Sequence, residues 1–292
     1  MKKTTFLALL ALALSISLSA QQTFHNNGVA DEREKYFAFT HATIVVDYQT
    51  TLKDATLIIR DGKIEAVGAG LALPKGAAEI NLEGKYLYPS FIDIYSDYGL
   101  PSAQSAPQQG PQPPQFDTKK TGSYNWNQAV HPEVHADAMY KNDAEKAKQL
   151  RELGFGTVSS HQMDGIVRGT GALVLLGDER ENMNVVRNES AEYYSFNKGV
   201  STQSYPNSLM GSIALLRQTY LDAQWYKQSG YKEQNNISLD ELNKALSLPQ
   251  IFEAGNVYSA LRADRVGDEF GINYIIKGSG DEYQRMDELK TA

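Results

Sequence analysis

The chain has 292 residues, of which 41% are hydrophobic and 22% charged, and this is the composition of an ordinary globular protein with a sizeable core. Its length is enough for about two domains. The formal net charge of −7 disfavours nucleic acids and anionic membrane surfaces as partners, because both reward a basic face. The sequence contains no cysteine, so the fold has no disulfide bonds.

The first 20 residues have the pattern of a secretory signal peptide. Lys2 and Lys3 form a positive start, and the apolar run "FLALLALALSISL" that follows is too short to span a bilayer comfortably. The small residues of "SLSAQQ" suit cleavage after Ala20. We therefore expect an exported protein, periplasmic or secreted, with no membrane partner once residues 1–20 are removed.

Residues 36–89 are expected to form a small all-β domain. Short apolar-alternating segments run through this region, and Asp61-Gly62 stands between two of them. This is the signal of a type I′ hairpin turn, in which glycine accepts a positive φ without steric cost.

From residue 90 onward, strand and helix patterns alternate, which indicates parallel βαβ units. The apolar run "FIDIYS" (91–96) is typical of a strand buried on both faces, and three further strands are expected within 156–162, 249–255 and 272–280. Helices are predicted over 132–154, 208–230, 238–246 and 257–271, the third with a capping box from Ser238 to Glu241. The segments 165–179 and 182–196 look like β excursions. A closed (β/α)8 barrel needs eight strands, so we expect an incomplete barrel and a chain that is the N-terminal portion of a longer protein.

Residues 54–93 resemble the N-terminal region of the amidohydrolase superfamily, in its imidazolonepropionase-like branch. The residues that match the family's entry into its barrel are Gly84, Lys85, Pro89, Ile92 and Asp93. A weaker match covers residues 256–289. The resemblance implies an α/β protein with a small β-sandwich over 36–89, followed by an incomplete (β/α)8 TIM-type barrel over 90–292 with a Pro/Gln-rich loop at 101–124.

The resemblance also implies where a metal site would lie. Members of the family bind a divalent metal, typically zinc, through two histidines at the end of the first barrel strand, and those positions are Tyr95 and Asp97 here. The corresponding positions on two later strands fall near Glu253 and Lys277. A tyrosine is neutral near pH 7, and a lysine would repel a metal ion, which leaves Asp97 as the one plausible ligand. We therefore expect no cofactor in this chain and a degenerate metal site.

Other histidines give weaker signals. His131 and His135 have the i, i+4 spacing of a metal pair on a helix, but we favour a helix start, with His131 near the N-cap and Pro132 in the first turn. His161 ends a predicted strand on what would be the functional face of a barrel, and we expect a loop histidine with satisfied ring nitrogens.

Two functions stay open. The first is a hydrolase acting on carbon–nitrogen, non-peptide bonds of a small molecule, with this segment catalytically degenerate. The second is a non-catalytic amidohydrolase-like module that binds or scaffolds a partner. A downstream amidohydrolase module is the partner that the resemblance suggests.

Overall fold

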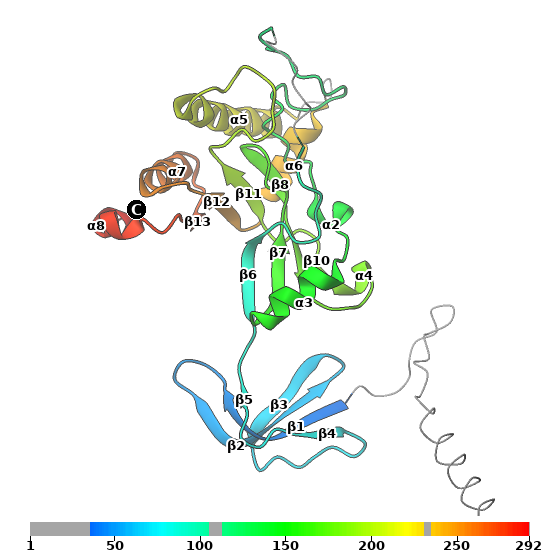
Figure 1. Cartoon of the computed structure of the whole chain (residues 1–292). Coiled ribbons are helices and arrows are strands. Elements are labelled where there is room, and N and C mark those ends of the chain that lie inside the picture. The colour runs from blue at the N-terminus through cyan, green and yellow to red at the C-terminus, as the bar shows by residue number, and fades with distance from the viewer. Residues whose placement is uncertain (1–35, 105–112, 231–234, 292) are drawn as a thin grey trace, which may run out of the picture. The chain divides into compact units, whose positions relative to one another are not determined.

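The computed structural model describes residues 36–104, 113–230 and 235–291, so the predicted signal peptide lies outside the described residues. The chain divides into two compact units between Pro89 and Ser90 (Figure 1). None of the described helices is long and apolar enough to cross a membrane.

The first unit is built on one sheet. Its strands are β1 (Tyr36–Val45), β2 (Thr51–Arg60), β3 (Lys63–Ala69), β4 (Ala78–Asn81) and β5 (Tyr86–Leu87). β2 pairs antiparallel with β1 and β3, while β4 and β5 run parallel to β1. The strands form a single sheet where we expected a sandwich, because the long strand β1 carries β2 on one edge and both β4 and β5 along the other.

The predicted hairpin turn of this unit is confirmed. Asp61 and Gly62 connect β2 to β3 with φ angles of 48° and 74°. Two positive φ angles in succession define the type I′ turn.

The described residues of the second unit form two four-stranded sheets, in the orders β10-β9-β7-β6 and β13-β12-β11-β8. The strands are β6 (Phe91–Ser96), β7 (Phe155–Ser160), β8 (Val167–Thr170), β9 (Ala172–Leu175), β10 (Val185–Arg187), β11 (Glu192–Ser195), β12 (Gln250–Glu253) and β13 (Tyr274–Lys277). β6 is parallel to β7, and β11, β12 and β13 are parallel to one another. The strand β11, which we assigned to a β excursion, therefore belongs to the parallel series.

The described strands do not close into a barrel. β8 and β9 are separated only by Gly171 and pair antiparallel with β11 and β7, so that they stand between the two parallel sets. A Cβ atom at Gly171 would lie 2.5 Å from the ring of Tyr193 and 3.0 Å from the carbonyl oxygen of Ser160. The chain can pass from one sheet to the other here because this residue has no side chain.

The strand β6 is more exposed than its sequence predicts. Phe91, Ile92 and Ile94 are 64%, 60% and 46% exposed, although the apolar run indicated burial on both faces. Among the described strands β6 pairs only with β7 and so forms a sheet edge. An apolar run predicts burial of a parallel strand only where neighbours cover both of its sides.

The helices of the second unit are α2 (Ala136–Met139), α3 (Ala144–Glu152), α4 (Glu181–Asn184), α5 (Leu209–Ser229), α6 (Ile237–Ala245), α7 (Val257–Phe270), the 3-10 turn η2 (Glu282–Arg285) and α8 (Met286–Leu289). α5 and α7 lie where the sequence predicts them. The prediction of a single helix over 132–154 is wrong, because the helical conformation is interrupted between α2 and α3. Asp143 caps α3 by accepting the backbone N–H of Lys146. The cap of α6 is Asn236, and Ser238 instead accepts the backbone N–H of Asn125.

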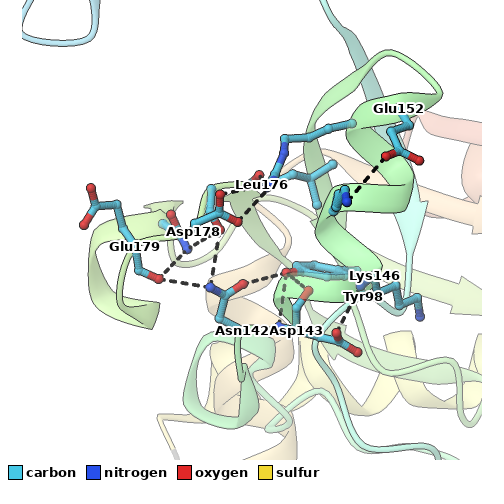
Figure 2. A network of polar contacts seen from close by, with 12 residues as sticks. Tyr98, Asn142, Asp143, Lys146, Glu152, Leu176, Asp178 and Glu179 are labelled. Atoms are coloured by element: carbon cyan, nitrogen blue, oxygen red, sulfur yellow. Dashed lines mark hydrogen bonds and ion pairs between the residues drawn. The ribbon is translucent and has the colours of Figure 1, made fainter. Parts of the chain in front are cut away.

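A polar network holds the break between α2 and α3 in place (Figure 2). The hydroxyl of the buried Tyr98 donates to Asn142 Oδ1 at 2.7 Å and accepts the backbone N–H of Asp143 at 3.2 Å. Asn142 Nδ2 in turn donates to the carbonyl oxygen of Glu179 at 3.0 Å. The bond to Asp143 satisfies a backbone N–H that a continuous helix would have paired internally.

The main core of the second unit lies between its second sheet and the helices α5, α6 and α7 (Figure 1). Tyr194 of β11 and Phe252 of β12 are fully buried against Leu216 of α5 and Leu242 of α6. This packing fixes the positions of β11 and β12, whose carboxyl ends contribute to the site below.

Candidate functional site

The carboxyl ends of the parallel strands gather the candidate residues. Tyr95 is near the end of β6, and His161 directly follows β7. Ser195, Glu253 and Lys277 end β11, β12 and β13 and are aligned in register. In βα folds this end of the strands is where functional groups meet.

Arg168 of β8 reaches the same place. Its Nη1 donates to the Tyr95 hydroxyl at 2.8 Å, and its Nη2 donates to Glu253 Oε2 at 2.8 Å. Its Nε donates to the carbonyl oxygen of Gly165 at 3.1 Å. The residue is 3% exposed, so this guanidinium is buried and bonded through all three of its nitrogens.

Lys277 completes the group. Its Nζ lies 3.9 Å from Glu253 Oε1 and 4.9 Å from the centre of the Tyr95 ring, a geometry in which the ammonium is attracted by the face of the ring. The structure thus brings together three of the residues that the resemblance indicated, namely Tyr95, Glu253 and Lys277.

Asp97 does not join them. β6 ends at Ser96, so the alternation of side chains that would align Tyr95 with Asp97 stops before Asp97. The carboxylate of Asp97 instead lies 3.2 Å from Nζ of Lys146 on α3, and its side chain is 57% exposed.

The protonation of the group follows from its surroundings. Burial raises the pKa of Tyr95 to about 12, so its hydroxyl stays neutral. Burial also opposes ionisation of Glu253, but the interactions with Tyr95 and Arg168 outweigh it and lower the pKa of that carboxyl. The site therefore holds a carboxylate between a guanidinium and an ammonium.

His161 forms the inner wall of this site. Its ring stacks on Tyr193 with centroids 3.6 Å apart and planes 3° apart, and it meets the Tyr95 ring edge at 4.6 Å. It is completely buried, and neither ring nitrogen has a hydrogen-bond partner among the described residues. The expectation of a satisfied loop histidine is wrong. Burial, together with the charge of Arg168, lowers the pKa of His161 to about 2, so the ring is neutral.

These residues do not fit a divalent metal ion. The described part of the chain has no group of three His, Cys, Asp or Glu side chains that could hold one. Glu253, the carboxylate of the site, already binds the cation of Arg168. A metal ion placed beside Tyr95 would be repelled by both Arg168 and Lys277.

The other histidines of the sequence analysis lie apart from this group. His131 precedes α2 by several residues, and the residue before α2 is His135, so the two do not share a helix. His135 Nδ1 is 2.8 Å from Thr170 Oγ1, and its ring nitrogens lie 3.7 Å and 3.6 Å from carboxylate oxygens of Glu189 and Glu241.

Arg168 is the residue of the site that the sequence analysis missed. It stands in "GIVRGTG" as one charged residue in an otherwise apolar and glycine-rich stretch. A charge in a strand that is expected to be buried requires a partner of opposite charge, and that requirement was the available signal. Its partners are 73 and 85 residues away in sequence.

Comparison with known proteins identifies the fold. No protein-family model matches the sequence, and no curated protein does. Among solved structures, an amidohydrolase from Thermotoga maritima MSB8 is similar over 85% of this chain and 66% of its own, with a TM-score of 0.67 and 21% identity. A D-hydantoinase (dihydropyrimidinase) from a Thermus species is matched over 83% of this chain and 57% of its own, at a TM-score of 0.31 and 13% identity. The chain thus spans just under two thirds of the Thermotoga protein, and the first of these matches shows that the two share a fold.

Proposed function

Taking the amidohydrolase fold as the premise, we propose that this chain is a degenerate, metal-independent member of the amidohydrolase superfamily that acts as a binding or scaffolding module. The observation that carries the proposal is the guanidinium of Arg168, bonded to Tyr95 and Glu253 at the strand ends. A hydrolytic metal site needs open coordination positions for water. Here the guanidinium of Arg168 already binds Tyr95 and Glu253, the side chains that a metal ion at this place would need as ligands.

The burial of Arg168 supports the view that it stays bound to Glu253. A buried ion pair is expensive to open, because each separated charge would lose its partner in a low-dielectric surrounding. The neutral ring of His161 lies against the same tyrosine and so brings no charge that would compete with Arg168 for Glu253.

Metal analysis of the purified mature protein tests this proposal. We expect less than stoichiometric divalent metal, and no change in thermal unfolding when a chelator is added. The variant Asp97→Ala should leave the metal content unchanged, since Asp97 binds Lys146. Stoichiometric zinc that is lost in Asp97→Ala, or a chelator-dependent melting temperature, would overturn the proposal.

A hydrolase acting on carbon–nitrogen bonds is the second candidate. The fold match to the Thermotoga amidohydrolase favours it, and the chain presents Glu253 and Lys277 at the strand ends, 29% and 39% exposed at their side chains. Turnover of small cyclic or linear amides by the wild-type chain, abolished in Glu253→Gln, would favour this function over the first.

We also propose that the protein is exported. This rests on residues 1–20 alone, which lie outside the described residues. Expression in a bacterium followed by N-terminal sequencing of the mature protein should give Gln21 as the first residue, whereas an intact Met1 in the mature fraction would contradict export. A further amidohydrolase module as a partner stays a prediction.

A further inference from the structure

The strands β1 and β2 of the first unit carry two bulges that compensate each other. The pairs that define their register are Phe39 with Leu57, Ala42 with Ala55, and Ile44 with Leu52. Between the first two pairs β1 has one residue more than β2, and between the last two pairs β2 has the extra residue. The register is therefore shifted at the middle pair, whose two alanines are completely buried, and is restored at the next.

The residue before each of these alanines has a left-handed backbone conformation. His41 has a φ of 58° and Asp54 a φ of 47°. In the part of the chain that the structure describes, the other non-glycine residue with a positive φ is Asp61 of the hairpin turn. A residue with a side chain adopts this conformation at some cost and keeps it where other contacts hold it in place.

A side-chain hydrogen bond joins the two bulges. Nδ1 of His41 lies 2.7 Å from Oδ1 of Asp54, a length within the range of charge-assisted bonds. A neutral imidazole can still donate from Nδ1, but the bond then lacks the attraction between a cation and an anion. The strength of the contact between the bulges therefore depends on the proton that the ring gains or loses.

Two further carboxylates act on the ring of His41. They belong to Glu79 on β4 and to Glu83, which follows that strand. Oε1 of Glu79 accepts from the hydroxyl of Thr40 at 3.1 Å, which holds this carboxylate beside β1. The hydrogen bond to Asp54 and the negative charges of all three carboxylates raise the pKa of His41 above its ordinary value.

We propose that His41 and Asp54 form a pH-sensitive switch, which fixes the paired bulges of β1 and β2 when the imidazole is charged and loosens them when it is neutral. The sign follows from the raised pKa of His41. The contribution of the pair is full below about pH 6.5, where an unfolded histidine titrates, and is lost as the pH rises through the higher value in the folded chain. The inference concerns the first unit alone and holds whether or not the second unit binds a metal ion.

NMR titration of the histidine rings in the mature protein tests the first step. The ring signals of His41 are assigned by their loss in His41→Asn, since asparagine tolerates a positive φ. Their midpoint should lie above about pH 6.5, the value of an unperturbed histidine. In Asp54→Asn the midpoint should move to lower pH, because the nearest carboxylate is gone. A wild-type midpoint at or below the unperturbed value, or an unchanged midpoint in Asp54→Asn, would overturn the proposal.

Amide hydrogen exchange tests whether the bulges respond to the proton. After correction for the intrinsic pH dependence of exchange, protection of the amides at 41–43 and 54–56 should fall about two- to fivefold as the pH rises from about 6 to about 8.5, the effect expected of one exposed charged pair. In His41→Asn it should stay constant. The amides of Ile59 and Ile64, which pair beside the hairpin turn of the same sheet, are the internal control and should not change in either protein.

Two results would contradict the switch, namely constant protection of the bulges in the wild type and an equal fall in His41→Asn. If His41→Asn does not fold, Asp54→Asn replaces it. That variant keeps the titrating ring and removes its partner, so its bulges should be less protected than those of the wild type at about pH 6 and should change less as the pH rises. Protection equal to that of the wild type at both pH values would also overturn the proposal.

Discussion

Arg168 on β8 donates a hydrogen bond of 2.8 Å to Glu253 on β12, across 85 residues of sequence. The two side chains are 4% and 29% exposed, so the ion pair is largely removed from solvent. It joins the antiparallel strand β8 to the parallel strand β12 at the end where the candidate residues meet.

Replacing Arg168 by methionine should destabilise the protein strongly. Of the two cations beside it, Glu253 would keep the more distant Lys277. We expect a loss of about 2–4 kcal/mol in the free energy of unfolding, below the usual cost of a broken buried pair because Glu253 is partly exposed. Urea denaturation measures it. Arg217→Met is the control, because Arg217 and Glu269 form an exposed pair at 2.6 Å that should contribute less than about 1 kcal/mol.

The double variant Arg168→Met, Glu253→Met separates the pair from its environment. Apolar replacement of both partners of a buried pair is often neutral or stabilising, so the double variant should recover most of the stability lost in Arg168→Met. If Arg168→Met costs no more than Arg217→Met, the ion pair does not hold the strand ends together.

His161 should make the protein less stable in acid. The pKa of its ring is about 2 in the folded chain and about 6.5 in an unfolded one. Between these values the unfolded state binds a proton that the folded state does not, so stability falls as the pH is lowered from 6.5, by up to about 1.4 kcal/mol per pH unit.

The variant His161→Phe isolates this effect. It keeps a ring against Tyr193 and cannot bind a proton, so its stability should fall less between pH 6.5 and pH 5 than that of the wild type. The comparison of slopes is needed because burial also lowers the pKa of His131, which acts in the same direction in both proteins. Identical slopes would show that His161 titrates normally.

The strand ends of the site could be predicted from the sequence, but the residue that fills the site could not. Tyr95, Glu253 and Lys277 lie at or next to the ends of strands that the alternating pattern and the resemblance located. Arg168 lies on β8, whose pairing with β11 involves an antiparallel crossing that no local pattern specifies. Tertiary packing, and no local sequence pattern, therefore determines that Arg168 pairs with Glu253.

Local competition explains the errors in the helices. Apolar spacing favoured one helix over 132–154, yet Asn142 and Asp143 bond to Tyr98 in preference to continuing it. Short polar side chains offer the backbone such alternatives. At α6 both Asn236 and Ser238 are good caps, and which one acts depends on the contact of Ser238 with Asn125, which lies far away in sequence.

Glu192→Gln should stabilise the protein at neutral pH. Glu192 is completely buried, its Oε1 accepts the backbone N–H of Gly169 at 3.2 Å, and its Oε2 has no hydrogen-bond partner among the described residues. Burial raises the pKa of this carboxyl well above its ordinary value, so the folded chain holds a proton that the unfolded chain releases. The contribution of Glu192 to stability is therefore full below about pH 4 and is lost as the pH rises above it.

Glutamine is neutral at every pH and removes that loss, so we expect a gain of at least about 1 kcal/mol at pH 7 and none at pH 4. Thermal unfolding at the two pH values measures it. Glu189→Gln is the matched control, because its side chain is 54% exposed and the same substitution should change stability by less than about 0.5 kcal/mol at either pH. A gain of equal size at pH 4 and pH 7 would show that Glu192 is ionised in the folded protein, and that the added amide, not the lost titration, stabilises the variant.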